Sequence, residues 1–146
     1  MKINTYKITD KKKERIDIFY EEMRADTIEI IDFIKSKDLT ISAYEADGSC
    51  QIPLKDIFYI EAVDNKIFAY LESKVYEIKM KLYEFENLFN PYRFFRCSKS
   101  CIINLMKIDT IKPALNSRFT ANLKNGEKVI ISRQYVSQLK KVLGGE

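Results

Sequence analysis

A cluster of hydrogen-bond donors stands in the middle of Phe94–Asn104, a stretch that reads FFRCSKSCIIN. Arg96, Ser98 and Lys99 lie between an aromatic pair and an apolar run that stops at an asparagine. A strand buried on one face alternates apolar and polar residues, and one buried on both faces is apolar throughout. This stretch changes character in its middle. It therefore predicts either a strand with a polar window that faces a ligand, or a strand whose polar residues face water.

The rest of the chain argues against catalysis and against a structural metal site. It contains no histidine, the usual general base, and we identify no nucleophile paired with an activating group. Its three cysteines are Cys50, Cys97 and Cys101, too few ligands for tetrahedral zinc. Sparse cysteines in odd number are typical of buried residues in a reducing compartment. We expect no enzyme, no metal and no cofactor.

The charge is distributed unevenly along the chain. Residues 91–146 carry 11 Lys and Arg against 3 Asp and Glu, a balance of +8, whereas residues 1–90 carry 14 against 18, a balance of −4. A basic half on a chain of net charge +4 favours a polyanionic partner, with nucleic acid first and an acidic protein or a membrane surface behind it. A basic face that only contacts water gives the same counts.

The length of 146 residues suits one domain with a short appendage. No apolar run is long enough to cross a bilayer, and the first residues lack the apolar core of a signal peptide. We therefore expect a soluble protein with a cytoplasmic location.

Residues 1–38 predict a ββα extension. Residues 1–8 and 16–20 indicate two weak strands, joined by a charged turn at Asp10–Lys13. From Arg24 to Lys37 the apolar residues follow a helical period. We place a boundary near residue 38, so that this extension braces or dimerises a domain formed by residues 39–146.

Residues 39–146 predict short strands and two helices. Asp47-Gly48 and Asn125-Gly126 suit the positive φ angles of two-residue hairpins, and Pro53 ends a strand because it cannot donate to a ladder. The expected strands are 41–46, 49–52, 57–63, 67–72, 75–79, 94–104, 107–113, 119–123 and 129–131. The first expected helix is 82–89, whose apolar face consists of Leu82, Phe85, Leu88 and Phe89. The second is capped by Ser132 and ended by Gly144-Gly145, and its apolar face consists of Val136, Leu139 and Leu143.

From about Leu39 to Leu143 the sequence resembles the LytTR DNA-binding domain of bacterial transcriptional regulators. Residues 94–104 resemble the F-x-R-x-H-x-S-x-x-V-N core of that family. Each of the other segments is a weak signal by itself, but all of them occur in the family's order and at fitting spacing. These segments are DIFYIE at 56–61, LYEFENLF at 82–89, LKNG at 123–126 and SRQY at 132–135.

The resemblance implies a mostly β fold of the α+β class: an elongated stack of short antiparallel sheets with one short internal helix and a C-terminal helix, here preceded by the ββα extension. It also implies that loops, rather than a recognition helix, enter successive major grooves of double-stranded DNA. A major groove accepts a loop as well as a helix. The three contact places that it implies are Asn65-Lys66, Ser98-Lys99 and Arg133-Gln134.

The hydrogen-bonding groups of these residues suggest their roles. Arg133 can present a planar fork to guanine, and Gln134 or Asn65 can pair with adenine. Lys99 can reach a base or a phosphate, whereas for Lys66 we favour a phosphate.

Arg96 could contact DNA or equally pair with a carboxylate, and we interpret Asn104 as tying down the turn after the strand. Ser98 stands where the family usually has histidine, so the contact of that imidazole is shortened or lost. Residues 1–38 are also too short for the phosphoacceptor receiver domain of many family members.

The leading hypothesis is a sequence-specific transcriptional regulator that binds DNA as a homodimer, without a small-molecule substrate or membrane insertion. The alternative is a protein-interaction module whose basic surface binds an acidic protein partner.

Overall fold

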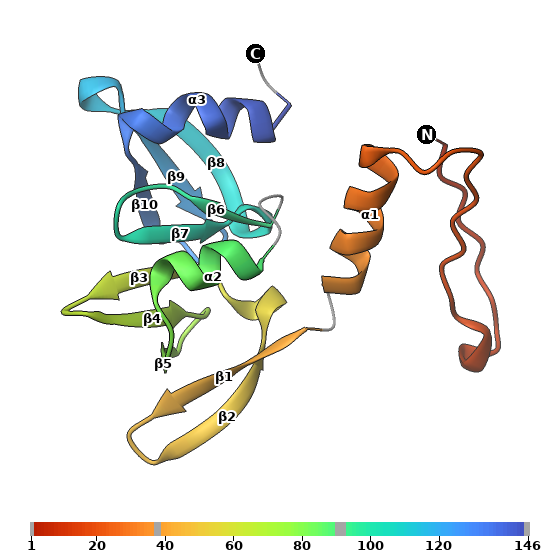
Figure 1. Cartoon of the computed structure of the whole chain (residues 1–146), viewed down its shortest axis with the longest axis horizontal. Helices are drawn as coiled ribbons and strands as arrows, with labels where there is room; N and C mark the ends of the chain where they lie inside the picture. Colours follow the sequence, from red (N-terminus) through yellow and green to blue (C-terminus); the bar gives the residue numbers. More distant parts are fainter. Residues whose placement is uncertain (1, 37–38, 90–92, 145–146) are drawn as a thin grey trace.

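Two antiparallel sheets, three α-helices and an extended N-terminal segment make up the described part of the chain (Figure 1). The structure is a computed structural model and describes residues 2–36, 39–89 and 93–144. The mostly β, α+β architecture predicted from the sequence is confirmed.

The larger sheet contains seven strands in the order β2-β1-β5-β4-β3-β7-β6, and all neighbours are antiparallel. A two-residue turn joins β3 to β4, because Val63 pairs with Lys66. Both turn residues, Asp64 and Asn65, have positive φ angles of 50° and 64°, which is the geometry that a two-residue hairpin requires. The strands are β1 Thr40–Glu45, β2 Gly48–Pro53, β3 Tyr59–Val63, β4 Lys66–Tyr70, β5 Val75–Ile78, β6 Phe94–Arg96 and β7 Cys101–Asn104.

The smaller sheet has the order β10-β9-β8 and is followed by the last helix. The predicted turn at Asn125-Gly126 lies in a three-residue loop, in which Gly126 has a φ of 88° and the Leu123 N–H donates to the Glu127 carbonyl. Ser132 occupies the predicted N-cap position of the helix, but its side chain forms no capping hydrogen bond. Gly144 follows the end of the helix with a φ of 76°. The elements are β8 Ile108–Pro113, β9 Phe119–Leu123, β10 Lys128–Ile131 and α3 Arg133–Val142.

Two hydrophobic cores lie on opposite faces of β6 and β7. Helix α2 (Leu82–Leu88) contacts β3, β6 and β7 and contributes to the first core, together with Phe94 and Ile102. Phe95 and Ile103 belong to the second core, which the smaller sheet and α3 complete. Burial on both faces explains why all four residues of β7 are buried and why this part of the sequence is apolar without alternation.

The predicted strand over Phe94–Asn104 is wrong as a single element. The structure forms a hairpin in which Phe94 pairs with Asn104 and Arg96 with Ile102. The chain reverses at residues 97–100, where the Cys97 and Ser98 N–H groups donate to the Cys101 carbonyl and the Ser100 N–H donates to the Ser98 hydroxyl oxygen. The polar window of the sequence is therefore the tip of a loop.

The helix of the predicted N-terminal extension is confirmed, but its two strands are not. Residues 2–24 contain a short 3-10 turn over Lys11–Lys13 and no strand, and α1 follows at Ala25–Ser36. A two-stranded hairpin is at best marginally stable when it has nothing to cover. Helix α1 approaches the domain where the Arg93 guanidinium lies 5.3 Å from the centre of the Phe33 ring.

Smaller corrections concern one turn and two helical stripes. The β1–β2 turn consists of residues 46–47, because Glu45 pairs with Gly48, so the turn begins one residue earlier than predicted. Leu88, the last residue of the helix, is 66% exposed, whereas Phe89, which follows with extended backbone angles, packs on the core. Leu143 is 53% exposed because the helix ends at Val142, which packs in its place.

Candidate nucleic-acid interface

The polar centre of Phe94–Asn104 forms a tight loop over residues 97–100, which we call the β6–β7 loop. The Cys97 and Ser98 N–H groups both donate to the Cys101 carbonyl, at 3.0 and 3.3 Å. The Ser100 N–H donates to the Ser98 hydroxyl oxygen at 3.2 Å. These bonds fix the backbone of the loop and leave the Lys99 side chain exposed.

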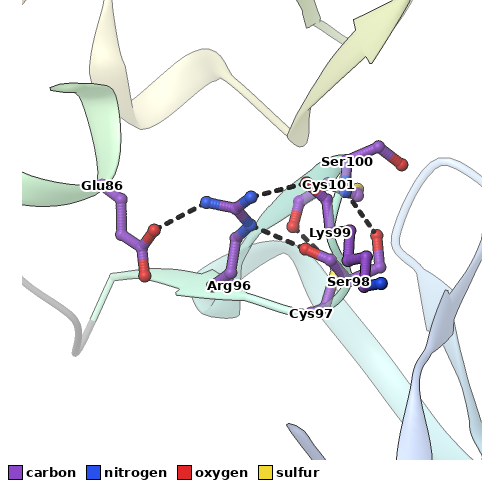
Figure 2. A network of polar contacts seen from close by, with 7 residues as sticks. All are labelled: Glu86, Arg96, Cys97, Ser98, Lys99, Ser100 and Cys101. Carbon is purple, nitrogen blue, oxygen red and sulfur yellow. Dashed lines mark hydrogen bonds and ion pairs between the residues drawn. The ribbon is translucent and has the colours of Figure 1, made fainter. Parts of the chain in front are cut away.

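Arg96 holds this loop from its base, as Figure 2 shows. Its Nε donates to the Ser98 carbonyl at 2.6 Å and its Nη2 to the Lys99 carbonyl at 2.5 Å. Its Nη1 forms an ion pair of 2.7 Å with Glu86 of α2. The guanidinium group thus has three partners within the protein. One of them is a carboxylate, so the ion pair that the sequence offered as an alternative to a DNA contact is present.

The Glu86–Arg96 pair is only partly screened by water, since the side chains are 43% and 19% exposed. Helix α2 therefore orients Arg96, and Arg96 orients the two carbonyls that flank the Lys99 side chain. Arg96 belongs to the predicted contact residues, and its geometry gives it a positioning role for Lys99.

The β6–β7 loop is also tied to the start of α3. The Ser132 N–H, just before the helix, donates to the Cys97 carbonyl at 2.8 Å. Cys97 and Cys101 are buried free thiols, and a hydrogen bond with the Cys97 side chain together with burial raises the pKa of the Cys101 thiol, which keeps it protonated. The Ser132–Cys97 hydrogen bond holds Arg133 and Gln134, the next two residues of the chain, at a fixed place relative to Lys99.

A surface hollow of about 590 Å³ brings two of the three predicted contact places together. Ser98 and Lys99 line one part of it, and Arg133 and Gln134 line another. Lys99, Arg133 and Gln134 are exposed. The side chains that line the hollow are Ser98, Lys99, Ser100, Asn116, Arg118, Ser132, Arg133 and Gln134, which include three cations and no carboxylate.

The loop between β8 and β9 contributes Asn116 and Arg118 to the hollow. The sequence patterns did not predict this loop as a contact place. Asn116 and Ser117 both have a φ of 60°, an uncommon backbone geometry for residues other than glycine. Arg118 Nε donates to the Leu115 carbonyl at 3.1 Å, so the loop closes on itself. The signal in the sequence was Asn-Ser-Arg between two predicted strands, where a turn and a cation coincide.

The third predicted place, Asn65-Lys66, lies outside the hollow at the exposed tip of the β3–β4 hairpin. The hairpin is linked to the β6–β7 loop because the Ala62 N–H donates to the Ser100 carbonyl at 2.8 Å. In Figure 1 this tip, the β6–β7 loop and the start of α3 lie along the same, left-hand side of the domain. Three exposed polar sites thus follow one edge of the molecule.

Asn104 and Tyr59 form polar contacts behind this edge. Asn104 is fully buried, donates to the Ile57 carbonyl at 2.7 Å and accepts from the Met106 N–H at 3.0 Å, which confirms that it ties down the turn after β7. The Tyr59 ring stacks on Tyr70 with centroids 4.4 Å apart. Burial and a hydrogen bond to Glu127, which follows β9, raise the pKa of Tyr59 above its ordinary value.

No three metal-binding side chains gather at one point among residues 2–36, 39–89 and 93–144. In the same described part of the chain, no helix is long and apolar enough to span a membrane.

The chain matches known proteins over most of its length. Residues 47–144 match the sequence model of the LytTR family, described as the LytTr DNA-binding domain. A solved structure, the LytTr DNA-binding domain of a Bacillus cereus protein described as a methyl-accepting/DNA response regulator, is 34% identical. It superimposes with a TM-score of 0.69 over 72% of this chain and 96% of that one.

Two full-length relatives differ in how much of them the chain covers. The transcriptional regulatory protein YpdB of Escherichia coli K12 is 31% identical over 105 residues, which are 71% of this chain and 43% of YpdB. The chain therefore spans less than half of that relative. An uncharacterized HTH-type transcriptional regulator of Staphylococcus aureus is 26% identical over 145 residues, which are 98% of both chains.

Proposed function

The chain belongs to the LytTR family of DNA-binding domains, and from that membership we propose that it is a sequence-specific transcriptional regulator. The main support for this proposal is the hollow that Lys99, Arg118 and Arg133 line together. Three cations in a hollow that no carboxylate lines form a site for phosphate and for the acceptor-rich edge of guanine. The regulator would act on DNA in the cytoplasm and needs no catalytic step.

The contacts that we propose reach successive major grooves from one edge of the domain. The β6–β7 loop and the first residues of α3 would enter one groove together, because the Ser132–Cys97 hydrogen bond fixes them relative to each other. The tip at Asn65-Lys66 would approach the next groove. Loops can serve because a few side chains that reach base edges provide the specificity, while phosphate contacts set the register.

The individual roles follow from side-chain chemistry. Arg133 would donate its fork to guanine O6 and N7, and Gln134 or Asn65 would pair with adenine. Lys66 would bind a phosphate, and Lys99 would bind a base or a phosphate. Arg118 joins the predicted residues as a phosphate contact, because its charge faces the same hollow as Lys99 and Arg133.

Two residues of the motif would act without a strong base contact. The Ser98 hydroxyl accepts from the Ser100 N–H, so it stabilises the loop and still has a proton to donate to a phosphate. Arg96 would act through the carbonyls that it holds, as described above. The sequence preference of this chain would accordingly rest on Arg133, Gln134, Asn65 and Lys99.

Selection from random DNA duplexes by the full chain tests the proposal. We expect an enriched site, and Arg133→Ala should weaken binding to it by about 1–3 kcal/mol and relax the preference at one position. Lys74→Ala is the matched control. Lys74 is exposed and lies after the end of β4 that is remote from the Asn65-Lys66 tip. If selection at moderate salt enriches no sequence, the chain is not a specific DNA-binding protein.

A further inference from the structure

The N-terminal arm, which we define as residues 2–23, exposes an unusual amount of apolar surface. Tyr6 is 84% exposed and Phe19 is 93% exposed. Scattered single apolar residues on a surface are normal, but a dense group of them indicates an interaction site. The large apolar residues exposed in the arm are Ile3, Tyr6, Ile8, Ile16, Phe19, Tyr20 and Met23.

The backbone of the arm is also available for pairing. The arm reverses at a 3-10 turn over Lys11–Lys13, where the Asp10 side chain accepts from the Lys12 N–H. On both sides of this turn, the backbone of residues 2–9 and 15–22 forms no hydrogen bond with another described residue. Extended segments with unpaired N–H and C=O groups are templates for strand pairing with another chain.

The two legs of the arm carry opposite charge. The first leg, residues 2–8, contains Lys2 and Lys7 and no acidic residue, a charge of +2. The second leg, residues 14–22, contains four carboxylates and Arg15, a charge of −3. A symmetric interface in which the same surface is used twice requires this kind of self-complementarity.

We propose that the N-terminal arm forms a dimer with a second copy of the chain, with the basic first leg of each copy paired against the acidic second leg of the other. The available area suits this partner. Tyr6, Phe19 and Tyr20 alone supply about 450 Å² per copy at the low end of what buried aromatics cover. With the four aliphatic residues, the two copies reach the roughly 1,200–2,000 Å² of a stable interface.

The placement of the arm lets the dimer and DNA contacts coexist. In Figure 1 the arm and α1 lie on the right-hand side of the domain, opposite the three proposed contact sites. Helix α1 reaches the domain through the Phe33 ring, which contacts Arg93. The similarity to the Staphylococcus aureus regulator spans 98% of both chains, so it extends through the arm, beyond the residues that match the family.

Sedimentation of the full chain over a wide concentration range tests this dimer. We expect wild-type dimers, and the double variant Tyr6→Ser, Phe19→Ser should raise the dissociation constant about tenfold or more, because buried aromatics dominate interfaces. Both residues are exposed in the single chain, so the fold should survive, as circular dichroism will show. Leu88→Ser on α2, also exposed, is the matched control and should leave the dimer unchanged.

Charge reversal tests the crossed pairing of the legs. Lys2→Glu with Lys7→Glu gives two acidic legs, and Glu21→Lys with Glu22→Lys gives two basic legs, so each variant alone should associate about tenfold or more weakly than wild type. Mixing the two variants should restore a heterodimer, because each leg then meets one of opposite charge. A wild-type monomer at every concentration, a dimer that persists in the aromatic variant, or no recovery on mixing would each overturn the proposal.

Discussion

Replacement of Arg96 by alanine tests how the candidate DNA surface is built. The substitution removes two hydrogen bonds to carbonyls, at 2.6 and 2.5 Å, and the 2.7 Å ion pair with Glu86. We assign about 1 kcal/mol to each hydrogen bond and at most about 1 kcal/mol to the partly exposed ion pair. Arg96→Ala should therefore lower the free energy of unfolding by about 2–3 kcal/mol, measured by urea denaturation.

The same substitution should weaken DNA binding indirectly. Without Arg96 the Ser98 and Lys99 carbonyls lose their partner, and the β6–β7 loop must be ordered when DNA binds. We expect affinity for the selected site to fall about tenfold, which corresponds to about 1.4 kcal/mol. Glu86→Gln should weaken binding in the same direction but less, because it loosens Arg96 without removing its bonds to the loop.

Two results would refute this reasoning. If Arg96→Ala unfolds at the same urea concentration as wild type, the guanidinium does not hold the loop. If it lowers the salt slope of binding by about one unit while Glu86→Gln changes nothing, Arg96 contacts a phosphate directly. Arg118→Ala is the stability control, because this exposed arginine has a single bond to the Leu115 carbonyl and its loss should change stability by no more than about 0.5 kcal/mol.

Other predictions follow from single side chains. Lys99→Ala should leave urea denaturation unchanged and, if Lys99 binds a phosphate, reduce the salt slope of DNA binding by about one unit; an unchanged slope with altered base preference would instead identify a base contact. Asn65→Gly should keep the hairpin, since glycine adopts a φ of 64° readily, yet weaken DNA binding, which a mobility-shift titration will measure. Asn104→Leu should destabilise the fold by about 1–3 kcal/mol in urea denaturation, because it leaves the buried Ile57 carbonyl without its donor. The pKa of Tyr59 is raised on folding, so its contribution to stability is complete below the ordinary tyrosine pKa of about 10 and is lost as the pH rises further. Thermal unfolding measured across that range should show a smaller alkaline loss for Tyr59→Phe than for wild type.

The sequence predicted the elements whose signals are local. The helical period of residues 24–37, the strand alternation before Asn125-Gly126 and the capping position of Ser132 all depend on neighbours within a few residues, and each is present near the predicted place. The family match also placed Ser98-Lys99 and Arg133-Gln134 among the candidate contacts, and the structure brings these pairs to one hollow. Their contact with DNA stays a prediction.

Other features depended on contacts that no local pattern contains. The N-terminal strands failed because period-2 alternation does not say whether a partner exists, and residues 2–24 have none among the described residues. The Arg118 contribution was missed because it faces the hollow only after β8 and β9 bring the loop toward α3. Likewise, the length of 94–104 does not distinguish one strand from two short ones.

By itself, the sequence determined the family, the α+β class and the uneven charge of the chain, since these follow from residue types and their order. Only the tertiary structure decided that the polar window at 97–100 is a loop, held by Arg96 and by Glu86 of α2. The reason is physical: an arginine fork can satisfy carbonyls or contact a phosphate, and the choice depends on which groups the fold places around it.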